Sequence, residues 1–334
     1  MTRAGTAALL GGLAGFVLVA YYFGDQVLAT FARAQPWYLA LYLAAAVAVR
    51  LGYVLRWRAL ARALRTDGSV RRLALARLAA DAVAAISPAG RLSGDPLRIV
   101  LVREPRRGAR AAAAVALDRL IETFGNSFAA MAYIAVFWIT WSADRQVWNG
   151  LGLAMLAGGV GLAASLALLA LGYRPLAPLY RLIDWLGVRW LRIAVVGVRR
   201  AERHAGDLMR LQPGLAMAAI FVSLAIEAVT VLEYSLIFRA FGVSLELPMV
   251  LVSMLVGGVS RAAPTPGGLG AFEASQVAAF GAALGQPELG FTVGIITRIH
   301  ELLWAGVGFA ALLAAGLPVG RLRSQLAAGK AATA

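Results

Sequence analysis

The chain has 334 residues, of which 60% are hydrophobic and only 15% are charged. Soluble domains carry about 25% charged residues, so this composition excludes an ordinary water-soluble protein and predicts a membrane protein. The formal net charge is +15, and Lys330 is the only lysine among the 32 cationic residues. Because the arginines stand between apolar runs, they indicate membrane topology and lipid contacts rather than nucleic-acid binding. The lack of cysteine excludes disulfides, thiolate metal sites and cysteine nucleophiles.

Six apolar runs are long enough to cross a bilayer as helices, which takes about 20 residues each. The first run also resembles a secretory signal, because Arg3 precedes it and Ala32-Arg33-Ala34 follows it. Its length and the later runs favour a retained helix over a cleaved one. The six runs cover residues 6–23, 37–55, 111–141, 150–173, 215–238 and 291–317.

Two further apolar stretches, 73–98 and 247–284, are interrupted by proline and glycine near their centres. The interruptions read Ser-Pro-Ala-Gly at 87–90 and Pro-Thr-Pro-Gly-Gly at 264–268. A proline inside a helix removes a backbone donor and clashes with the preceding turn. We therefore expect each stretch to form a re-entrant hairpin of two half-helices.

Arginine placement predicts the orientation, because arginines concentrate in cytoplasmic loops. They cluster between the second and third runs, between the fourth and fifth, and after the last run, so both termini are expected in the cytoplasm. The segment 179–211 alternates apolar and charged residues at helical spacing, which predicts an amphipathic helix along the headgroups or, alternatively, a solvated linker helix. The arginines between the second and third runs are Arg56, Arg58, Arg62, Arg65, Arg71, Arg72, Arg77, Arg91, Arg98, Arg103, Arg106, Arg107 and Arg110.

The two halves of the chain repeat a charged pattern. In each half a carboxylate stands seven residues after a bend proline, and an Arg-x-x-Glu sequence begins 24 or 25 residues after that carboxylate. Agreement in both spacing and residue type indicates an internal repeat. The members are Pro88, Asp95, Arg119 and Glu122 in the first half, and Pro266, Glu273, Arg298 and Glu301 in the second.

The repeat defines the expected organisation of a single integral membrane domain, 1–334. The first repeat covers 1–149, the second covers 150–317, and 318–334 is a cytoplasmic tail. Each half crosses the membrane three times, so the second half must insert upside down relative to the first. We expect an all-α polytopic membrane protein with six transmembrane helices and two re-entrant hairpins arranged as inverted repeats, the plan of many secondary transporters.

Two stretches resemble a known family. Residues 87–122 contain Pro-x-Gly, Gly-Asp-x-x-Arg and Ala-Leu-Asp-Arg-Leu-Ile-Glu, and residues 264–273 read Pro-Thr-Pro-Gly-Gly-Leu-Gly-Ala-Phe-Glu. They are similar to the lysylphosphatidylglycerol synthase transmembrane region family, a flippase-like domain found alone or fused to a cytosolic aminoacyl-lipid synthase. The resemblance implies lipid translocation in a bacterial inner membrane. Only a short alanine-rich tail follows Arg323, so we expect no synthase domain and no lipid aminoacylation.

Charged residues inside a bilayer cost roughly 2.5 to 3.5 kcal/mol on insertion scales, so they must pair or face a watery cavity. The two Arg-x-x-Glu sequences place opposite charges one helical turn apart, where they can pair. The bends expose helix N-termini, which favour anions, and the glycines of the second bend allow a phosphate to approach the backbone. The predicted substrate-binding residues are Arg91, Asp95, Arg98, Asp118, Arg119, Glu122, Arg261, Gly267, Gly268, Gly270, Glu273, Arg298 and Glu301.

Structural roles remain open for several of these residues. The ion pairs serve equally well to neutralise charge between helices, the glycines to allow close packing, and Asp95 and Glu273 to cap their half-helices. Glu227 and His300 are candidates for proton coupling, and His300 is alternatively a packing residue. Glu233 is expected to pair with Arg239 or to lie near the interface. Nucleotide-phosphate and zinc motifs are lacking, so we expect no cofactor and no metal.

The predicted function is transport of a phospholipid or of a lipid-linked anionic headgroup between leaflets, without enzymatic activity. One alternative is an intramembrane lipid-headgroup transferase that uses Glu122 or Glu301 as a base. Another is a non-catalytic partner of a lipid or hopanoid biosynthesis enzyme, which binds through the basic surface of 179–211. The expected partners are therefore membrane lipids and, in the last case, such an enzyme.

Overall fold

The computed structural model describes residues 34–66, 68–87, 91–102, 108–140, 210–260 and 268–314, together with single positions elsewhere. Within these ranges the chain is helical and no strand occurs. The predicted run 6–23, almost all of the run 150–173, most of the segment 179–211 and the predicted tail lie outside the described residues.

Four of the predicted runs form long helices: α2 (Pro36–Ala63), α5 (Gly108–Thr140), α9 (Pro213–Ala240) and α12 (Pro287–Ala314). Of these, α2, α9 and α12 are long and apolar enough to cross a membrane, and α5 has 33 residues. Large apolar side chains such as Leu55, Phe221 and Leu302 are more than half exposed on these helices, as expected for surfaces that face lipid. The protein is therefore a multi-pass membrane protein.

Each interrupted stretch forms two helices that pack against each other. The first pair is α3 (Val70–Ile86) and α4 (Arg91–Val102), and the second is α10 (Leu247–Ser260) and α11 (Ala271–Leu284). Both breaks fall where proline and glycine predicted them. Local contacts fix the helix starts: the Ser69 hydroxyl accepts the Arg72 N–H at 3.3 Å before α3, and the Gly270 N–H donates to Glu273 at 2.8 Å before α11.

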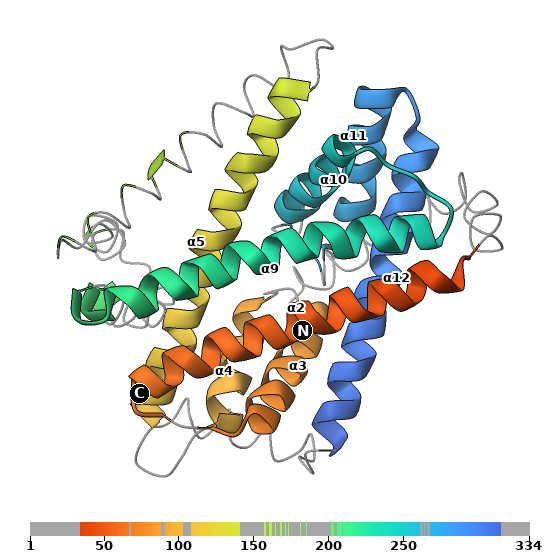
Figure 1. Cartoon of the computed structure of the whole chain (residues 1–334). Helices are drawn as coiled ribbons and strands as arrows, with labels where there is room; N and C mark the ends of the chain where they lie inside the picture. Colours follow the sequence, from red (N-terminus) through yellow and green to blue (C-terminus); the bar gives the residue numbers. More distant parts are fainter. Residues whose placement is uncertain are drawn as a thin grey trace.

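Helices α2 and α9 lie side by side and run in opposite directions (Figure 1). Three contacts show the direction, because residue numbers rise along α2 as they fall along α9. The Gln35 N–H donates to the Ala240 carbonyl at 2.7 Å, Arg50 donates to Glu233 at 2.8 Å, and Arg56 donates to Ser223 at 2.9 Å. Both helices have 28 residues and begin with a proline that follows a glutamine.

The two hairpins occupy opposite sides of the α2–α9 pair. In Figure 1, α3 and α4 lie below α2, whereas α10 and α11 lie above α9. Each hairpin also packs on a long helix of the other half: α12 packs on α3, and α5 packs on α10. The halves therefore interlock, and polar side chains from both of them meet between the hairpins.

Apolar clusters hold the helices around this polar interior. One cluster joins α9, α11 and α12 through Phe238, Phe280 and Ile296, which are fully buried. A second cluster lies beneath the first hairpin and includes Trp57 and Leu73. Within a bilayer such side chains stabilise the helix contacts mainly through van der Waals packing, which fixes the positions of the charged residues between them.

Candidate functional site

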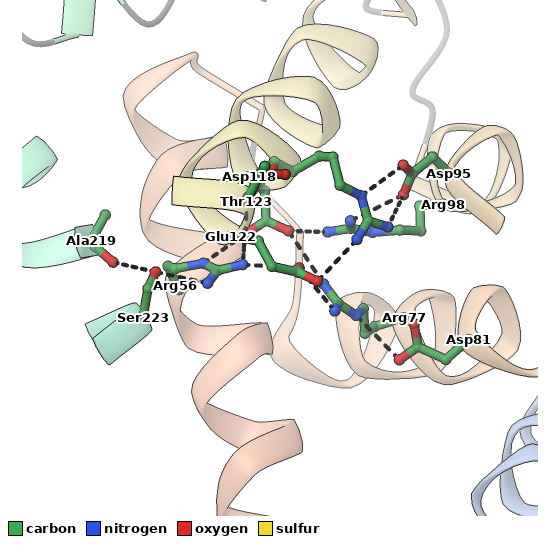
Figure 2. A network of polar contacts seen from close by, with 11 residues as sticks. Arg56, Arg77, Asp81, Asp95, Arg98, Asp118, Glu122, Thr123, Ala219 and Ser223 are labelled. Carbon is green, nitrogen blue, oxygen red and sulfur yellow. Dashed lines mark hydrogen bonds and ion pairs between the residues drawn. The ribbon is translucent and has the colours of Figure 1, made fainter. Parts of the chain in front are cut away.

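Asp118 on α5 is the centre of a buried ion network beside the first hairpin. Its carboxylate accepts hydrogen bonds from Arg56 Nε at 2.9 Å, Arg98 Nη2 at 2.6 Å and Arg77 Nη1 at 3.4 Å. These donors come from α2, α4 and α3, and all four residues are at least 97% buried. Figure 2 shows the guanidinium groups converging on this carboxylate. Asp118 therefore joins four helices at one point.

Glu122, one turn after Asp118, is a second acceptor in the same network. It accepts from Arg56 Nη2 at 3.2 Å, Arg77 Nη2 at 3.1 Å and Arg119 Nη1 at 2.9 Å. The predicted pairing of Arg119 with Glu122 is thus confirmed. Aromatic rings support the cations as well, because Arg77 lies 4.4 Å from the centre of the Tyr53 ring.

Asp95 connects the hairpin helix α4 to α5. Its two oxygens accept hydrogen bonds from Arg119 Nε at 3.0 Å and Nη2 at 2.8 Å, which makes a bidentate salt bridge. A third hydrogen bond comes from Arg98 at 3.4 Å. These contacts are not those of the predicted helix cap. Asp95 lies in the second turn of α4, and its described partners are arginines rather than backbone N–H groups. Asp81 completes the network by accepting from Arg77 at 3.2 Å.

We call this set the first-hairpin network. Its four arginines face four carboxylates, so the group is formally neutral, as buried ions require. It corrects one sequence interpretation: Arg56 and Arg77 were counted as cytoplasmic topology signals, but they are 2% and 3% exposed and bind carboxylates inside the protein. The members are Arg56, Arg77, Asp81, Asp95, Arg98, Asp118, Arg119 and Glu122.

A smaller set beside the second hairpin, the second-hairpin triad, repeats part of this arrangement. Arg298 on α12 donates through Nε to Glu273 on α11 and through Nη1 to Glu301 at 2.6 Å. The predicted pairing of Arg298 with Glu301 is confirmed. Glu273 also accepts the Gly270 N–H, so its predicted capping role is confirmed together with its ion pair. The contacts Glu273–Arg298–Glu301 match Asp95–Arg119–Glu122 one for one.

A third cluster joins α2, α9 and α12. Arg50 donates to Glu233 at 2.8 Å and lies 3.9 Å from the centre of the Trp304 ring. His300 shares a hydrogen bond with the Tyr42 hydroxyl at 2.9 Å, and its other ring nitrogen lies 3.4 Å from Arg50. The prediction that Glu233 pairs with Arg239 is wrong. Glu233 binds Arg50 instead, and Arg239 is exposed near the end of α9.

A cavity of about 720 Å³ lies between the two hairpins. Ser87 at the end of α3 and Thr265 in the second bend both line it, so the two bends face one interior space. Its charged lining includes two arginines and four carboxylates, with His300 beside them. Arg119 and Arg298 do not belong to this lining, although Glu301, the partner of Arg298, does. The charged lining residues are Arg50, Arg77, Asp81, Glu227, Glu233 and Glu301.

The remaining predicted residues are two glycines of the second bend, Glu227, and three residues that the structure describes only in part or not at all. Gly268 and Gly270 have φ angles of 70° and 79°, which L-residues rarely adopt, so backbone conformation explains these glycines without a ligand. Glu227 lines the cavity and accepts from the Tyr133 hydroxyl at 3.2 Å. The side chain of Arg91 and the residues Arg261 and Gly267 lie outside the described part of the chain.

Sequence reasoning missed Arg50 and Asp81 and misplaced Arg56 and Arg77. A signal existed for Arg50, because it is the single charged residue within the apolar run 37–55. Arg77 and Asp81 stand four residues apart on one helix, where an ion pair is expected. Arg56 gave no local signal, since its carboxylate partners lie more than 60 residues away in the chain.

Comparison with known proteins agrees with the membrane fold. No curated protein and no solved structure matches the chain. The family described as lysylphosphatidylglycerol synthase TM region matches residues 7–321, which include both hairpins, both Arg-x-x-Glu sequences and all four long helices. The chain therefore belongs to the lysylphosphatidylglycerol synthase transmembrane region family, whose function concerns membrane lipids.

Proposed function

We propose that the protein transports a phospholipid between the two leaflets of a bacterial inner membrane. The observation that carries this proposal is the charged cavity between the hairpins, because both halves of the chain contribute to its lining. Its volume of about 720 Å³ lies within the ~300–1,000 Å³ typical of small-molecule sites. A headgroup crosses through this space while the acyl chains stay in lipid, which removes most of the cost of desolvating the headgroup.

The proposed mechanism uses an inverted repeat of six spans and two re-entrant hairpins. Supporting observations are the antiparallel α2 and α9, the opposite placement of the hairpins in Figure 1, and the matching contacts of Asp95–Arg119–Glu122 and Glu273–Arg298–Glu301. In such transporters the site lies between the repeats and each side opens in turn. On the proposed orientation the first hairpin enters from the cytoplasm, the second enters from outside, and both termini are cytoplasmic.

The cavity charges restrict the headgroup. A phosphodiester would bind to Arg50 and Arg77, the two arginines of the described lining, by replacing carboxylates that they bind in this state, such as Glu233 and Asp81. The four carboxylates of that lining repel additional negative charge, so a headgroup with one phosphate is favoured over a lipid-linked pyrophosphate. The expected anionic headgroup therefore has one phosphate group and neutral or cationic substituents.

Transport is tested with purified protein in liposomes that contain a fluorescent phospholipid. A membrane-impermeant reductant quenches the outer leaflet, and transport raises the quenched fraction. Gly258→Leu should slow transport because Gly258 lines the cavity and a Cβ there meets no atom within 4 Å, so the added side chain takes up cavity space. Gly306→Leu is the matched control, since Gly306 also has open space but does not belong to the lining. Equal transport in the two variants contradicts the assignment of the cavity.

The same assay separates the alternative functions. A lipid product of new mass, formed by the purified protein without leaflet exchange, identifies a headgroup transferase. Glu122 is poorly placed as its base, because it is 1% exposed, accepts bonds from three arginines and does not belong to the cavity lining. Glu301 lines the cavity and is the candidate to mutate in that case. Copurification of a lipid-biosynthesis enzyme with no intrinsic transport would identify a partner protein instead.

Orientation is tested separately by cysteine labelling in cells, which the lack of native cysteine makes unambiguous. Ser244→Cys in the exposed loop after α9 should react with a membrane-impermeant thiol reagent from outside. Arg71→Cys at the exposed start of α3 should react only after the membrane is opened. The reverse pattern contradicts the proposed orientation and leaves the transport assay unaffected.

A further inference from the structure

Helices α2 and α9 carry opposite charges at equivalent positions. Each helix has 28 residues and begins with a proline, so positions can be compared by their distance from it. Arg50 and Glu227 both stand fourteen residues after that proline, and Arg56 and Glu233 both stand twenty residues after it. At these two positions one helix has an arginine where the other has a glutamate, whereas the same register places Ser235 opposite Arg58 and Arg239 opposite Arg62.

One of the two ion pairs that this register allows is formed. Arg50 binds Glu233 at 2.8 Å. In this register the equivalent of Arg50 is Glu227, and the equivalent of Glu233 is Arg56. The contact equivalent to Arg50–Glu233 is therefore a pair between Arg56 and Glu227. In the structure Arg56 instead donates to Asp118, Glu122 and Ser223. The α2–α9 interface is therefore asymmetric, although its charges permit either pair.

Two inverted halves with the same fold can exchange conformations, because the backbone packing of the exchanged arrangement is equivalent to the original one. This step rests on the inverted-repeat transport proposed above. Each contact between the halves is then replaced by its equivalent. We propose that Arg50–Glu233 and Arg56–Glu227 are alternating gate pairs: the first closes the interface in the state described here, and the second closes it in the state that opens to the opposite side.

The surroundings of the two pairs explain why Arg50–Glu233 is the one observed. Trp304 stacks on Arg50, and His300 lies 3.5 Å from Glu233. The equivalent of Trp304 on α5 is Gly125, because each stands six residues after the arginine of its Arg-x-x-Glu sequence. A cation over a tryptophan ring gains about 0.5 to 2 kcal/mol, and Arg50 lies 3.9 Å from the Trp304 ring whereas Arg56 lies 5.2 Å from the Tyr53 ring, so Arg50 has the closer aromatic contact.

Release of Arg56 from the first-hairpin network leaves its carboxylates with other partners. Asp118 keeps its bonds from Arg77 and Arg98. Glu122 keeps its bonds from Arg77 and Arg119. The side chain of Arg56 can therefore change partners without leaving a buried carboxylate alone, which is the costly outcome for a buried ion pair.

Cysteine reporters at the two bends test the exchange without a lipid assay. Ser87 and Thr265 are equivalent positions, because each stands eight residues before its hairpin carboxylate, and both line the cavity. Ser87→Cys and Thr265→Cys are made separately in the chain, which has no other cysteine. The rate of labelling by a membrane-impermeant thiol reagent is then measured in purified, reconstituted protein. The ratio of the two rates reports which bend is more accessible.

Glu233→Gln removes the observed pair, and Glu227→Gln removes its alternative, so they should shift this ratio in opposite directions. We expect shifts of about fivefold or more, the lower end of typical coupling factors between two sites. The double variant Arg50→Glu with Glu233→Arg restores the pair with reversed polarity and should return the ratio toward the parent value. Glu246→Gln, an exposed loop variant with the same chemical change, should leave it unchanged.

Shifts in the same direction, or no shift in either variant, overturn the proposal. If Glu233→Gln does not fold, Arg50→Gln breaks the same pair from the other side with the same expected direction, and Glu227→Ala likewise replaces Glu227→Gln. Opposite shifts in a protein that fails to move lipid would support the alternating gate and reject lipid transport. Normal lipid transport with unaltered labelling ratios would do the reverse, so the two proposals fail independently.

Discussion

In the first half, Asp95 on the hairpin binds Arg119 on the following long helix, and in the second half Glu273 binds Arg298 in the same way. Each arginine then binds a glutamate one turn further along its helix. The two regions differ in what surrounds this shared triad. Five further charged residues extend the first one: Arg56, Arg77, Asp81, Arg98 and Asp118.

This difference indicates how strongly each hairpin is attached to the neighbouring helices. The first-hairpin network connects α3 and α4 to both α2 and α5, whereas the second-hairpin triad connects α11 to α12 alone. Regions with fewer connections open at a lower free energy than the global unfolding of the protein. We therefore expect the second hairpin to move more readily than the first.

The largest effect is expected from Asp118→Ala. This change leaves three buried guanidinium groups without their shared acceptor, and uncompensated buried charge costs about 3 to 5 kcal/mol. We expect a large fall in the thermal midpoint of the purified protein, measured by size-exclusion chromatography after heating. Asp207→Ala, at an exposed position, is the control and should shift stability by no more than about 0.5 kcal/mol. An unchanged midpoint for Asp118→Ala would show that the network does not hold the first hairpin.

The equivalent substitutions Arg119→Ala and Arg298→Ala compare the two regions directly. After Arg119→Ala, Asp95 retains Arg98 and Glu122 retains Arg56 and Arg77, so we expect a loss of roughly 1 kcal/mol. After Arg298→Ala, Glu273 loses its arginine while it remains 0% exposed, so we expect a loss of roughly 3 kcal/mol.

Both variants should lose lipid transport in liposomes while still inserting into the membrane, because each breaks the link between a hairpin and its long helix. The thermal midpoint distinguishes them, since only Arg298→Ala should lower it strongly. Equal losses of stability would mean that the extra residues of the first-hairpin network add nothing to its triad. Normal transport in both variants would contradict a role for the triads in moving the headgroup.

The sequence was sufficient for features that depend on local spacing. Proline and glycine predicted the breaks within both interrupted stretches, because these residues disrupt helices wherever they stand. The pairs Arg119–Glu122 and Arg298–Glu301 were predicted because residues three apart share a helix face. Membership in the family followed from the residues around the bends. These predictions needed no knowledge of which helices meet.

Contacts between distant segments were beyond such reasoning. The apolar run ends at residue 55, but α2 continues to Ala63. Arg56 was therefore assigned to a loop, although it lies inside the protein. Its partner Asp118 and the Glu233 partner of Arg50 lie 62 and 183 residues away in the chain. From hydropathy alone, an arginine beside an apolar run is assigned to the protein surface. Only the packing of the helices shows that a buried carboxylate lies next to it.

The hairpins also differ in how closely their backbones pack. A Cβ at Gly94 of α4 would collide with the Ala80 carbonyl of α3, whereas a Cβ at Gly258 of α10 would meet no atom within 4 Å. Gly258 is the equivalent of Ala80, since each stands fifteen residues before its hairpin carboxylate. Gly94→Ala should therefore destabilise the protein by about 1 to 3 kcal/mol through overpacking.

Gly258→Ala is the corresponding test in the second hairpin, at the position equivalent to Ala80, the residue that a Cβ at Gly94 would meet. It should be neutral or stabilise the protein by up to about 1 kcal/mol, because alanine is the better helix former. Thermal midpoints of the two variants, measured side by side, check the difference in sign. A similar loss in both would mean that the second hairpin is as tightly packed as the first, and the expectation that it moves more readily would then fail, since a mobile hairpin needs space at its helix contacts.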